Sequence, residues 1–558
     1  MQLIECVPNF SEGNDVHIIT QITNEIESVD GVRLLNVDAG KATNRTVVTF
    51  AGSGEAVVEA AFKAIKKAGE LIDMSKHHGE HPRMGATDVC PLIPISNISL
   101  EETAQYARQL AKRVGEELNI PVYLYEAAQP NSERKNLSVI RAGQYEGFFE
   151  KIKQPEWKPD FGPDEFDAKR GGTVIGARDF LIAYNVNLNT TSTRRANAIA
   201  FDVREAGRSK AKDGKPVLDE KGNKVTVPGS LKAVKAIGWY IEEYGIAQIS
   251  MNLTNINQTP LHTAFDEVCK KADARGIRVT GSELVGMVPL KAMLDAGKYF
   301  LQKQKRSTGI SEKELIKIAI KSLGLDELTP FKPKERIIEY ILANESDSKL
   351  VSMPLNDFSD ETASESPAPG GGSIAAYVGS LGAALATMVA NLSAHKQGWD
   401  TRWKEFSDWA EKGAYYKNEL LKLVDEDTKA FNNIMGAFSL PKGSDEETKR
   451  RSKAIQDATR YAIEIPFKVM QTAFDSMDVI RAMAETGNPN SVSDAGVGAI
   501  CARAAVRGAL LNVKINAASF SDKEYVRDMI GRAEKIETEA ANREGEILKI
   551  VDEKISNS

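Results

Sequence analysis

Hydrophobic and polar positions follow two different patterns along the chain, one before and one after about residue 340. Up to about residue 340, short runs that alternate hydrophobic and polar residues are interleaved with longer stretches of helical period. These runs predict strands at residues 32–37, 45–50 and 122–125, and a helix at 55–72. A second cycle opens with another alternating run at residue 180. We therefore predict two α/β subdomains of a sandwich-like α+β kind, at residues 1–179 and 180–343.

The second pattern is purely helical. Residues 344–350 open a stretch rich in Ser, Asp, Glu and Pro that has little to bury, which is typical of a linker. Beyond it, hydrophobic residues recur at helical spacing in long runs dense in Ala, Glu, Lys and Leu. Residues 351–558 are predicted to form an all-α helical bundle. The predicted fold class is thus multidomain, with two α/β subdomains followed by an all-α bundle domain.

One helical run raises the question of a membrane span. Residues 373–392 carry no charge and are long enough to cross a bilayer. They are rich in Gly, Ala and Ser and have few large apolar side chains, so their transfer into lipid is unfavourable. We predict a central helix of the bundle or a dimer interface, because small residues let neighbouring helices approach closely.

Charge and cysteine content narrow the classes of partner. The 558 residues carry a formal net charge of −6, and the sequence pI is about 5.8. An acidic protein has no general attraction to nucleic acid or to anionic membranes, so small molecules and copies of the chain are the expected partners. The four cysteines lie far apart without a CxxC spacing, and the first residues lack the basic and apolar regions of a secretory signal. We predict a cytoplasmic protein.

Three of the six histidines lie within residues 77–81. Histidine titrates near neutral pH, so this run is a candidate for proton transfer. His81 is the strongest candidate, because Pro82 restricts its backbone and Glu80 and Arg83 flank it with opposite charges. A zinc site is the alternative, although the spacing is not that of a helical HExxH motif. The other two histidines can equally be hydrogen-bonded loop residues.

Two further polar segments are candidates for ligand binding. Asp38, Asn44 and Arg45 supply a carboxylate, an amide and a cation near a strand end, where sites are commonly built. For Asn44, a side chain that stabilises a turn is an equally good interpretation. The loop 160–172 contains an aromatic residue and two basic ones, which can place a flat heterocycle against a ring and hold an anionic tail.

One carboxylate of the helical half falls on a predicted buried face. At about 100° per residue, Asp427 projects from the middle of this face, whereas Asp425 points away from it. The apolar residues of the face are Leu420, Leu423, Val424, Ala430, Phe431, Ile434 and Met435. Burial raises the pKa of a carboxyl toward neutrality, which suits proton exchange. The alternative is a structural ion pair with Arg or Lys. The glycines 370–372, at a predicted helix start, offer backbone N–H groups to an anion.

Several motifs are specific enough to indicate a family. The segments IECVPNFSEG, NVDAGKATNRTVVTFAG, GEHPRMGATDVCPLIPI, GARDFLIAYNVNL and GSELVGMVPLKAMLDA resemble the formiminotransferase domain. PAPGGGSIAA and LVDEDTKAF are similar to the cyclodeaminase domain. As a whole, the chain resembles the formimidoyltransferase-cyclodeaminase family from its first residue to its last helices.

The resemblance implies two reactions on folate within histidine degradation. The formimino group of N-formimidoyl-L-glutamate passes to N5 of tetrahydrofolate, and the product then cyclises to 5,10-methenyltetrahydrofolate with release of ammonia. His81 is implied as the catalytic residue of the transfer and Asp427 as that of the cyclisation. Asp38 or Glu80 is expected to orient the amidinium, and the further substrate-binding residues are Asn44, Arg45 and Arg83. The implied folate-binding residues are Gly162, Pro163, Asp164, Glu165, Phe166, Asp167, Ala168, Lys169, Arg170 and Gly171.

The same resemblance sets expectations about cofactors and assembly. Tetrahydrofolate is the co-substrate, and neither step is expected to need a metal or a nucleotide, because the formimino carbon already has the oxidation level of the product. Family members assemble as rings of dimers, so a homo-oligomer built from dimers is expected. Two alternatives remain, a metal-dependent amidohydrolase and a folate-binding protein with an inactive cyclodeaminase half. The acidic loop residues 164–167 and the insertion at 208–230 depart from the family pattern.

Overall fold

The chain forms two compact units in a computed structural model that describes residues 2–40, 44–78, 82–212, 215–218, 225–342, 350–366 and 368–557. Unit 1 contains Met1–Ala292 and Leu323–Leu342, and unit 2 contains Met293–Ser322 and Ala343–Ser558. This division differs from the predicted boundary at residue 343, because residues 293–322 pack within the second unit. The predicted linker 344–350 lies, up to residue 349, outside the described residues.

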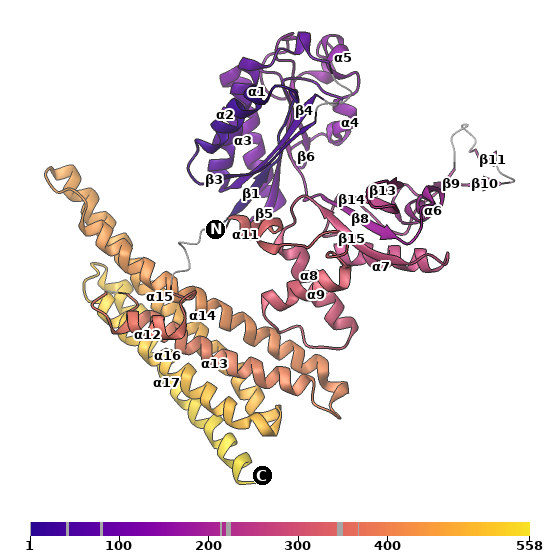
Figure 1. Cartoon of the computed structure of the whole chain (residues 1–558). Coiled ribbons are helices and arrows are strands. Elements are labelled where there is room, and N and C mark those ends of the chain that lie inside the picture. The colour runs from indigo at the N-terminus through magenta and orange to yellow at the C-terminus, as the bar shows by residue number, and fades with distance from the viewer. Residues whose placement is uncertain are drawn as a thin grey trace. The chain divides into compact units, whose positions relative to one another are not determined.

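The first part of unit 1 is built on a mixed seven-stranded sheet (Figure 1). Its strands are β1 (Leu3–Cys6), β2 (Asn9–Phe10), β3 (Val32–Gly40), β4 (Arg45–Gly52), β5 (Thr87–Ser96), β6 (Val122–Glu126) and β7 (Thr173–Ala177). They lie in the order β1-β4-β2-β5-β7-β6, with β3 beside β4. The β5–β7 and β7–β6 pairs are parallel, and the others are antiparallel.

Helices cover both faces of this sheet. Apolar residues of α1 (Val16–Glu27), α2 (Gly54–Leu71) and α3 (Leu100–Leu118) share one core with Cys90, Leu92 and Ile175. On the other face, α4 (Leu137–Ile140) and α5 (Gln144–Lys151) share a smaller core with Val89, Tyr123 and Val174. Both layers follow from the alternation of side chains along each strand.

A bulge interrupts β5 at Asp88. Phe10 of β2 pairs with Thr87, but the preceding residue Asn9 pairs with Val89, so Asp88 is an extra residue in the strand. An extra residue of this kind redirects its side chain relative to the regular alternation.

The second part of unit 1 is a four-stranded antiparallel sheet. Its strands β8 (Ile182–Leu188), β13 (Val234–Ile241), β14 (Ile246–Leu253) and β15 (Val279–Val285) lie in the order β13-β14-β8-β15, and α6 (Thr193–Val203) and α7 (Leu261–Asp273) pack beside them. The short strands of the insertion are β9 (Arg208–Ser209), β10 (Ala211–Lys212), β11 (Lys215–Pro216) and β12 (Thr226–Val227). Residues 213–214 and 219–224 of the insertion lie outside the described residues. Two short helices, α10 (Pro333–Arg336) and α11 (Ile338–Leu342), complete unit 1.

Unit 2 is entirely helical in its described part. Its helices are α12 (Leu355–Ala363), α13 (Gly371–Ala394), α14 (Trp403–Phe438), α15 (Asp445–Thr486), α16 (Val492–Ala517) and α17 (Lys523–Ser556), joined by a hairpin of α8 (Leu290–Lys303) and α9 (Glu312–Leu323). Polar contacts hold the tip of this hairpin, where Asn391 donates to the Gly309 carbonyl at 2.9 Å and Thr308 lies 3.0 Å from the Ser407 hydroxyl. The predicted fold class, α/β subdomains followed by an all-helical region, is confirmed.

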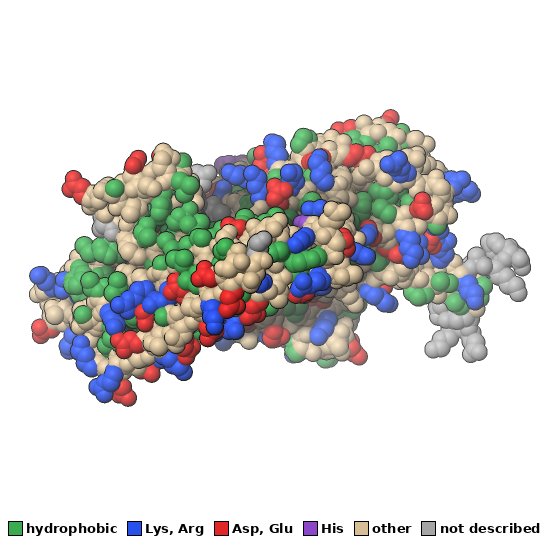
Figure 2. All heavy atoms as spheres, turned by 90° about the horizontal axis from the view of Figure 1, so that it is seen from below, with side chains coloured by type: hydrophobic (Ala, Val, Ile, Leu, Met, Phe, Trp, Pro, Cys, Tyr) green, Lys and Arg blue, Asp and Glu red, His purple; other side chains and the backbone are tan. Residues whose placement is uncertain are grey.

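Helix α13 is a central helix of the bundle, as predicted. It packs against α14, α15 and α16, and its buried residues are mainly Gly, Ala and Ser. A Cβ on Gly382 would lie 2.8 Å from the Gly498 carbonyl oxygen, so α13 and α16 approach closely there because of glycine. By length and composition, Gly371–Ala394 and Pro489–Ala517 could cross a membrane, and 61% and 50% of their most apolar windows are buried in the structure. On the face in Figure 2, acidic and basic side chains are interspersed.

Candidate functional site

The described part of the predicted transferase site lies around residues 77–78 and 82–83. His81 and Glu80 lie outside the described residues, so their roles stay predictions. Asn44, with a backbone φ of 46°, holds the segment 77–78: its Nδ2 donates to the His78 carbonyl at 2.8 Å, and its own carbonyl lies 2.9 Å from Nε2 of His77. Its Oδ1 accepts from the Gly13 N–H at 3.0 Å. Asn44 therefore ties three segments together, which is the structural role considered for it.

Arg83 also contacts this segment, through His77. Its guanidinium is buried and forms a two-pronged ion pair with Glu146 of α5, at 2.7 and 3.0 Å. Nε of Arg83 donates to Nδ1 of His77 at 3.3 Å. Arginine favours such two-pronged contacts with a carboxylate because its donors are planar and fixed. Arg83 thus fixes the residues that directly follow His81 in the chain.

A carboxylate that the sequence analysis missed lies near Arg83. Asp88 is completely buried, accepts the Met84 N–H at 2.9 Å and binds Nη2 of Arg141 at 2.7 Å. Burial raises its pKa to about 6, and the charges of Arg141, Arg45 and Arg83 oppose that rise. The bulge in β5 is the reason that Asp88 can face these arginines rather than the opposite core. A lone Asp in the buried run TDVCPLIPI was the signal that could have found it.

Arg45 and Asp38 lie near the same cluster. Arg45 is half buried, and burial lowers its pKa, while the nearby carboxylates Asp88 and Asp38 raise it. Asp38 is exposed on β3, the strand that pairs with β4 alone. The structure therefore brings Asp38, Arg45, Asp88 and Arg141 into one electrostatic neighbourhood that can receive a charged substrate.

The loop predicted to bind folate has its basic residues engaged by the protein. Arg170 pairs with Asp167 and donates to the Leu118 carbonyl at the end of α3, at 2.7 Å. Lys169 donates to the Glu70 carbonyl at the end of α2, at 2.9 Å. Cations are favoured at helix C-termini, which explains this use of both residues. Phe166 lies edge-on to the rings of Phe148 and Phe149, with centroids 5.9 and 5.7 Å away.

A cavity of about 600 Å³ lies between the two sheets of unit 1 and shares a wall with the Asp88 cluster. Arg141 lines it, together with Arg178 and Lys235, and its acidic side chains are Glu126 and Asp179. Three cations in one cavity suit a ligand with more than one carboxylate. Among the described residues there is no group of three or more His, Cys, Asp or Glu side chains that could hold a metal.

In unit 2, Asp427 projects from α14 against the start of α13. The hydroxyl of Ser373 donates to Asp427 Oδ2 at 3.0 Å, and Thr428 lies 3.4 Å from the same hydroxyl. Burial raises the pKa of Asp427, and the side-chain and backbone hydrogen bonds from Ser373 oppose the rise. The anion at the glycine-rich helix start is thus Asp427 itself, and it has no ion pair with Arg or Lys among the described residues.

The predicted buried face of α14 is correct over its first part. Leu420, Leu423, Val424 and Ala430 are buried, but Phe431 is 37% and Met435 53% exposed. The exposure of these two residues is a correction: Phe431 lines the cavity beside Asp427, although Ile434 packs against the core and Ala437 is buried in the same turns. Asp425 accepts the Leu350 N–H at 3.0 Å on another side of the helix, as predicted.

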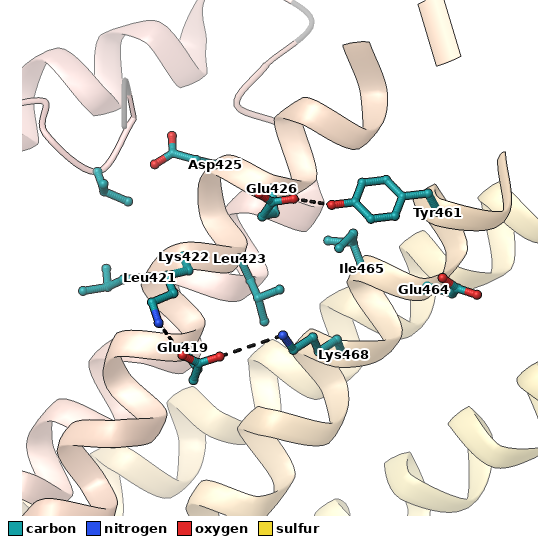
Figure 3. A pocket seen from close by; sticks show the side chains of 11 residues that line it. Glu419, Leu421, Lys422, Leu423, Asp425, Glu426, Tyr461, Glu464, Ile465 and Lys468 are labelled. Atoms are coloured by element: carbon teal, nitrogen blue, oxygen red, sulfur yellow. Dashed lines mark hydrogen bonds and ion pairs between the residues drawn. The ribbon is translucent and has the colours of Figure 1, made fainter. Parts of the chain in front are cut away.

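A second cavity, of about 660 Å³, lies on that other side of α14 (Figure 3). Glu419 pairs with Lys422 at 2.6 Å and with Lys468 at 3.8 Å across it, and Tyr461 donates to Glu426. Glu419, Glu426, Lys422 and Lys468 therefore each have a partner within the protein. We assign no chemistry to this cavity.

Comparisons with known proteins cover nearly the whole chain. Residues 3–178 match the family profile described as the formiminotransferase domain, N-terminal subdomain, residues 183–343 match the formiminotransferase domain, and residues 354–535 match formiminotransferase-cyclodeaminase. The chain is 43% identical over 554 residues to formimidoyltransferase-cyclodeaminase of Gallus gallus, which covers 99% of each chain. The Mus musculus relative of the same name is 43% identical over 548 residues, 98% of each.

About half of the chain also matches a shorter relative over nearly the whole length of that relative. Glutamate formimidoyltransferase of Thermoplasma acidophilum is 45% identical over 304 residues, which are 54% of this chain and 93% of the relative. Three family profiles in order, and relatives matched from end to end, leave one conclusion. This chain belongs to the formimidoyltransferase-cyclodeaminase family.

Proposed function

We propose that unit 1 transfers a formimidoyl group to tetrahydrofolate and that the helical unit 2 closes the ring of the product. The protein is a bifunctional enzyme of folate-dependent histidine degradation, with glutamate formimidoyltransferase and formimidoyltetrahydrofolate cyclodeaminase activities. The observation that carries the proposal is the end-to-end similarity to two-activity relatives. The two electrostatic centres, one in each unit, are where we place the chemistry.

In the first reaction, N5 of tetrahydrofolate attacks the amidinium carbon of N-formimidoyl-L-glutamate. A C–N5 bond forms, the bond from carbon to the glutamate nitrogen breaks, N5 loses a proton and the glutamate nitrogen gains one. We assign this proton transfer to His81, because an imidazole can take and return a proton near neutral pH. Asp38 or Glu80 orients the positively charged amidinium.

Substrate carboxylates meet the arginines of the same cluster. We assign Arg45 and Arg141 to the carboxylates of formimidoylglutamate, because both lie beside Asp88 and Arg141 lines the 600 Å³ cavity. Asn44 and Arg83 hold His77 and His78, the described residues that precede His81 in the chain. The loop 162–171 contacts folate through its backbone and Phe166, since Lys169 and Arg170 already bind carbonyl groups.

In the second reaction, N10 attacks the same carbon from within the folate. The C–N10 bond forms, the terminal C–N bond breaks, and the proton of N10 goes to the nitrogen that leaves as ammonia. We assign this relay to Asp427, whose carboxyl borders a cavity and whose pKa is raised by burial. Both reactions only move protons, so we expect tetrahydrofolate as co-substrate and no requirement for a metal or a nucleotide.

An apolar surface on unit 2 supports assembly into dimers. Outward residues of α16, Leu511 and Ile515, are 57% and 71% exposed, and Leu381 and Met388 extend the surface along the neighbouring α13. Exposed apolar side chains on two packed helices form the kind of surface that a second copy of the chain covers. We propose that it forms the dimer contact. Leu511→Glu combined with Ile515→Glu should then lower the mass seen by sedimentation, and an unchanged mass would refute this contact.

We also propose a cytoplasmic location. All four cysteines are free in the structure, and Cys6 and Cys90 are buried thiols 3.5 Å apart. Unpaired thiols are typical of reducing compartments. Fractionation of cells with an antibody to the chain tests this, and recovery in an oxidising compartment would contradict it.

A two-step assay tests the proposed function. With tetrahydrofolate and formimidoylglutamate supplied, methenyl product is followed by absorbance and ammonia is measured separately. His81→Ala should reduce transfer by about 10²- to 10⁴-fold and leave cyclisation of supplied 5-formimidoyltetrahydrofolate intact, and Asp427→Asn should do the reverse. Loss of activity with a chelator would favour a metal-dependent amidohydrolase, and folate binding without ammonia release would indicate an inactive second half.

A further inference from the structure

The cavity that borders Asp427 is small and has an unusual balance of charge. Its volume is about 110 Å³, whereas sites for drug-sized ligands have about 300–1,000 Å³. Its walls come from the start of α13 and from α14, α15 and α16. Asp427 is the only ionisable side chain among the described residues that line it, and no Lys, Arg or His does so. The cavity can therefore take a small polar group but not a whole folate.

Two asparagines form the wall supplied by α16. Asn512 and Asn516 are four residues apart, so they lie on one face of the helix. Nδ2 of Asn512 donates to the Gly508 carbonyl at 3.0 Å, and Nδ2 of Asn516 donates to the Ala462 carbonyl at 2.6 Å. One N–H of each amide is thus used within the protein, which orients the side chain, and its carbonyl oxygen can accept a hydrogen bond from a ligand.

The start of α13 does not turn this cavity into an anion site. Helix N-termini attract anions, but the carboxylate at this one is Asp427, held by the Ser373 hydroxyl at 3.0 Å. A further anion would face this carboxylate and two amide oxygens without any cationic side chain. A small cation with several N–H donors is favoured instead, because the carboxylate and the two amide oxygens can accept its hydrogen bonds.

We propose that this cavity binds the formamidinium-like head of the folate intermediate, with Asn512 and Asn516 accepting hydrogen bonds from its terminal nitrogen. This inference rests on the proposed role of Asp427 in cyclisation. The two amides determine specificity: a formyl group in place of the formimidoyl group presents an oxygen acceptor to them and leaves them unpaired. The same acceptors hold the ammonia nitrogen as the carbon–nitrogen bond breaks.

Inhibition by a free head group tests the inference on the full-length protein. Formamidinium chloride should inhibit cyclisation of supplied 5-formimidoyltetrahydrofolate competitively. Tetramethylammonium chloride at the same ionic strength is the control, because it is a cation without N–H donors. In Asn512→Leu and Asn516→Leu, inhibition by formamidinium should weaken by about 10-fold or more, since a hydrogen bond to a charged group is lost. Asn512→Asp keeps an oxygen acceptor, so formamidinium should inhibit this variant as it inhibits the wild type.

The outcomes separate the inference from the proposed function. If formamidinium inhibits no better than tetramethylammonium, or if both Leu variants keep the wild-type inhibition, the inference is wrong even where Asp427→Asn abolishes cyclisation. If Asp427→Asn cyclises at the wild-type rate, the proposed function is wrong as well. Circular dichroism and transfer activity of each sample verify folding, and Asn→Ser replaces any Leu variant that fails this check.

Discussion

Asp88 in unit 1 and Asp427 in unit 2 are both carboxyls whose pKa is raised by burial, but their surroundings are opposite in charge. Asp88 is completely buried, binds Arg141 and has Arg45 and Arg83 nearby. Asp427 is partly exposed to a cavity, is held by one serine and has no cationic neighbour in that cavity among the described residues. In the proposed function, the first carboxyl keeps arginines in place for an anionic substrate, and the second faces a cationic group directly.

In the proposed function, this difference lets two centres in one chain act on different groups of similar substrates. A carboxyl enclosed by guanidinium groups is a positioning residue, because its oxygens are occupied by the protein. A carboxyl that borders a cavity can exchange a proton with a ligand. Displacing Asp427 should therefore affect cyclisation, and neutralising Asp88 should affect the pH dependence of stability.

The largest effect is expected where Asp427 touches α13. A Cβ on Gly372 would lie 2.1 Å from Asp427 Oδ1, so Gly372→Ala must push this carboxyl aside. Misplacement of a catalytic group by about 1 Å can reduce a rate by about 10²-fold, so cyclisation should fall by at least that much. Transfer activity should not change. The measurement is the rate of methenyl formation from supplied 5-formimidoyltetrahydrofolate.

Gly436→Ala is the matched control, because a Cβ at Gly436 on α14 meets nothing within 4 Å. It makes the same helical glycine-to-alanine change away from the carboxyl. Equal loss in both variants, or no loss in Gly372→Ala, would count against the placement of Asp427.

A smaller effect is expected on stability when Asp88 is neutralised. Its pKa rises from 3.8 to about 6 on folding, so the folded state binds more protons than the unfolded state between these values. This contribution to stability is fully present below pH 3.8 and is lost as pH rises through about 6. A shift of two units corresponds to about 3 kcal/mol. Relative to Asp88→Asn, the wild type should therefore lose about 3 kcal/mol of unfolding free energy from pH 3.8 to above pH 6.

Urea unfolding of both proteins across this pH range measures the difference directly. If attraction to the three arginines outweighs the effect of burial, the wild type will instead gain on the variant as pH rises. That result would show that Asp88 is an ordinary ion-pair partner, and that burial does not raise its pKa as it does for Asp427.

The smallest effect is expected from Ser373→Ala. The Ser373 hydroxyl stabilises the ionised form of Asp427, so its removal should raise the pKa of this carboxyl further. The acid limb of the pH profile of cyclisation should move to higher pH, while the rate at high pH changes little. Ser380→Ala is the control, because that hydroxyl binds the Tyr377 carbonyl within the same helix. An unmoved acid limb would mean that Asp427 does not set the profile.

Helical period was enough to find Asp427, because one turn of α14 follows another without interruption and the side chain's face can be counted along the sequence. It was misleading only at Phe431 and Met435, which are exposed although Ile434 and Ala437 in the same turns are packed, because helical period alone does not say which neighbours cover a position. The strands and long helices were likewise predictable, since their patterns are local.

Asp88 and Arg141 could not be found in this way. They are 53 residues apart in the chain, and the bulge that turns Asp88 toward Arg141 breaks the alternation on which strand predictions depend. The ties made by Asn44 and Arg83 are also contacts between distant segments. For His81, Glu80 and the folate loop, the residue roles stay predictions, although the loop's basic side chains have visible partners.

The α8–α9 hairpin has a consequence for how the two activities can be separated. Because residues 293–322 pack in unit 2, the polypeptide passes between the units at 292–293, 322–323 and 342–343. A single cut near residue 343 would leave this hairpin attached to the transferase and would expose the surface of the bundle on which it packs. The packing there is close, since a Cβ on Gly309 would lie 2.3 Å from the Ala410 backbone. Fission of the gene into two working proteins would thus require new surface residues on both products.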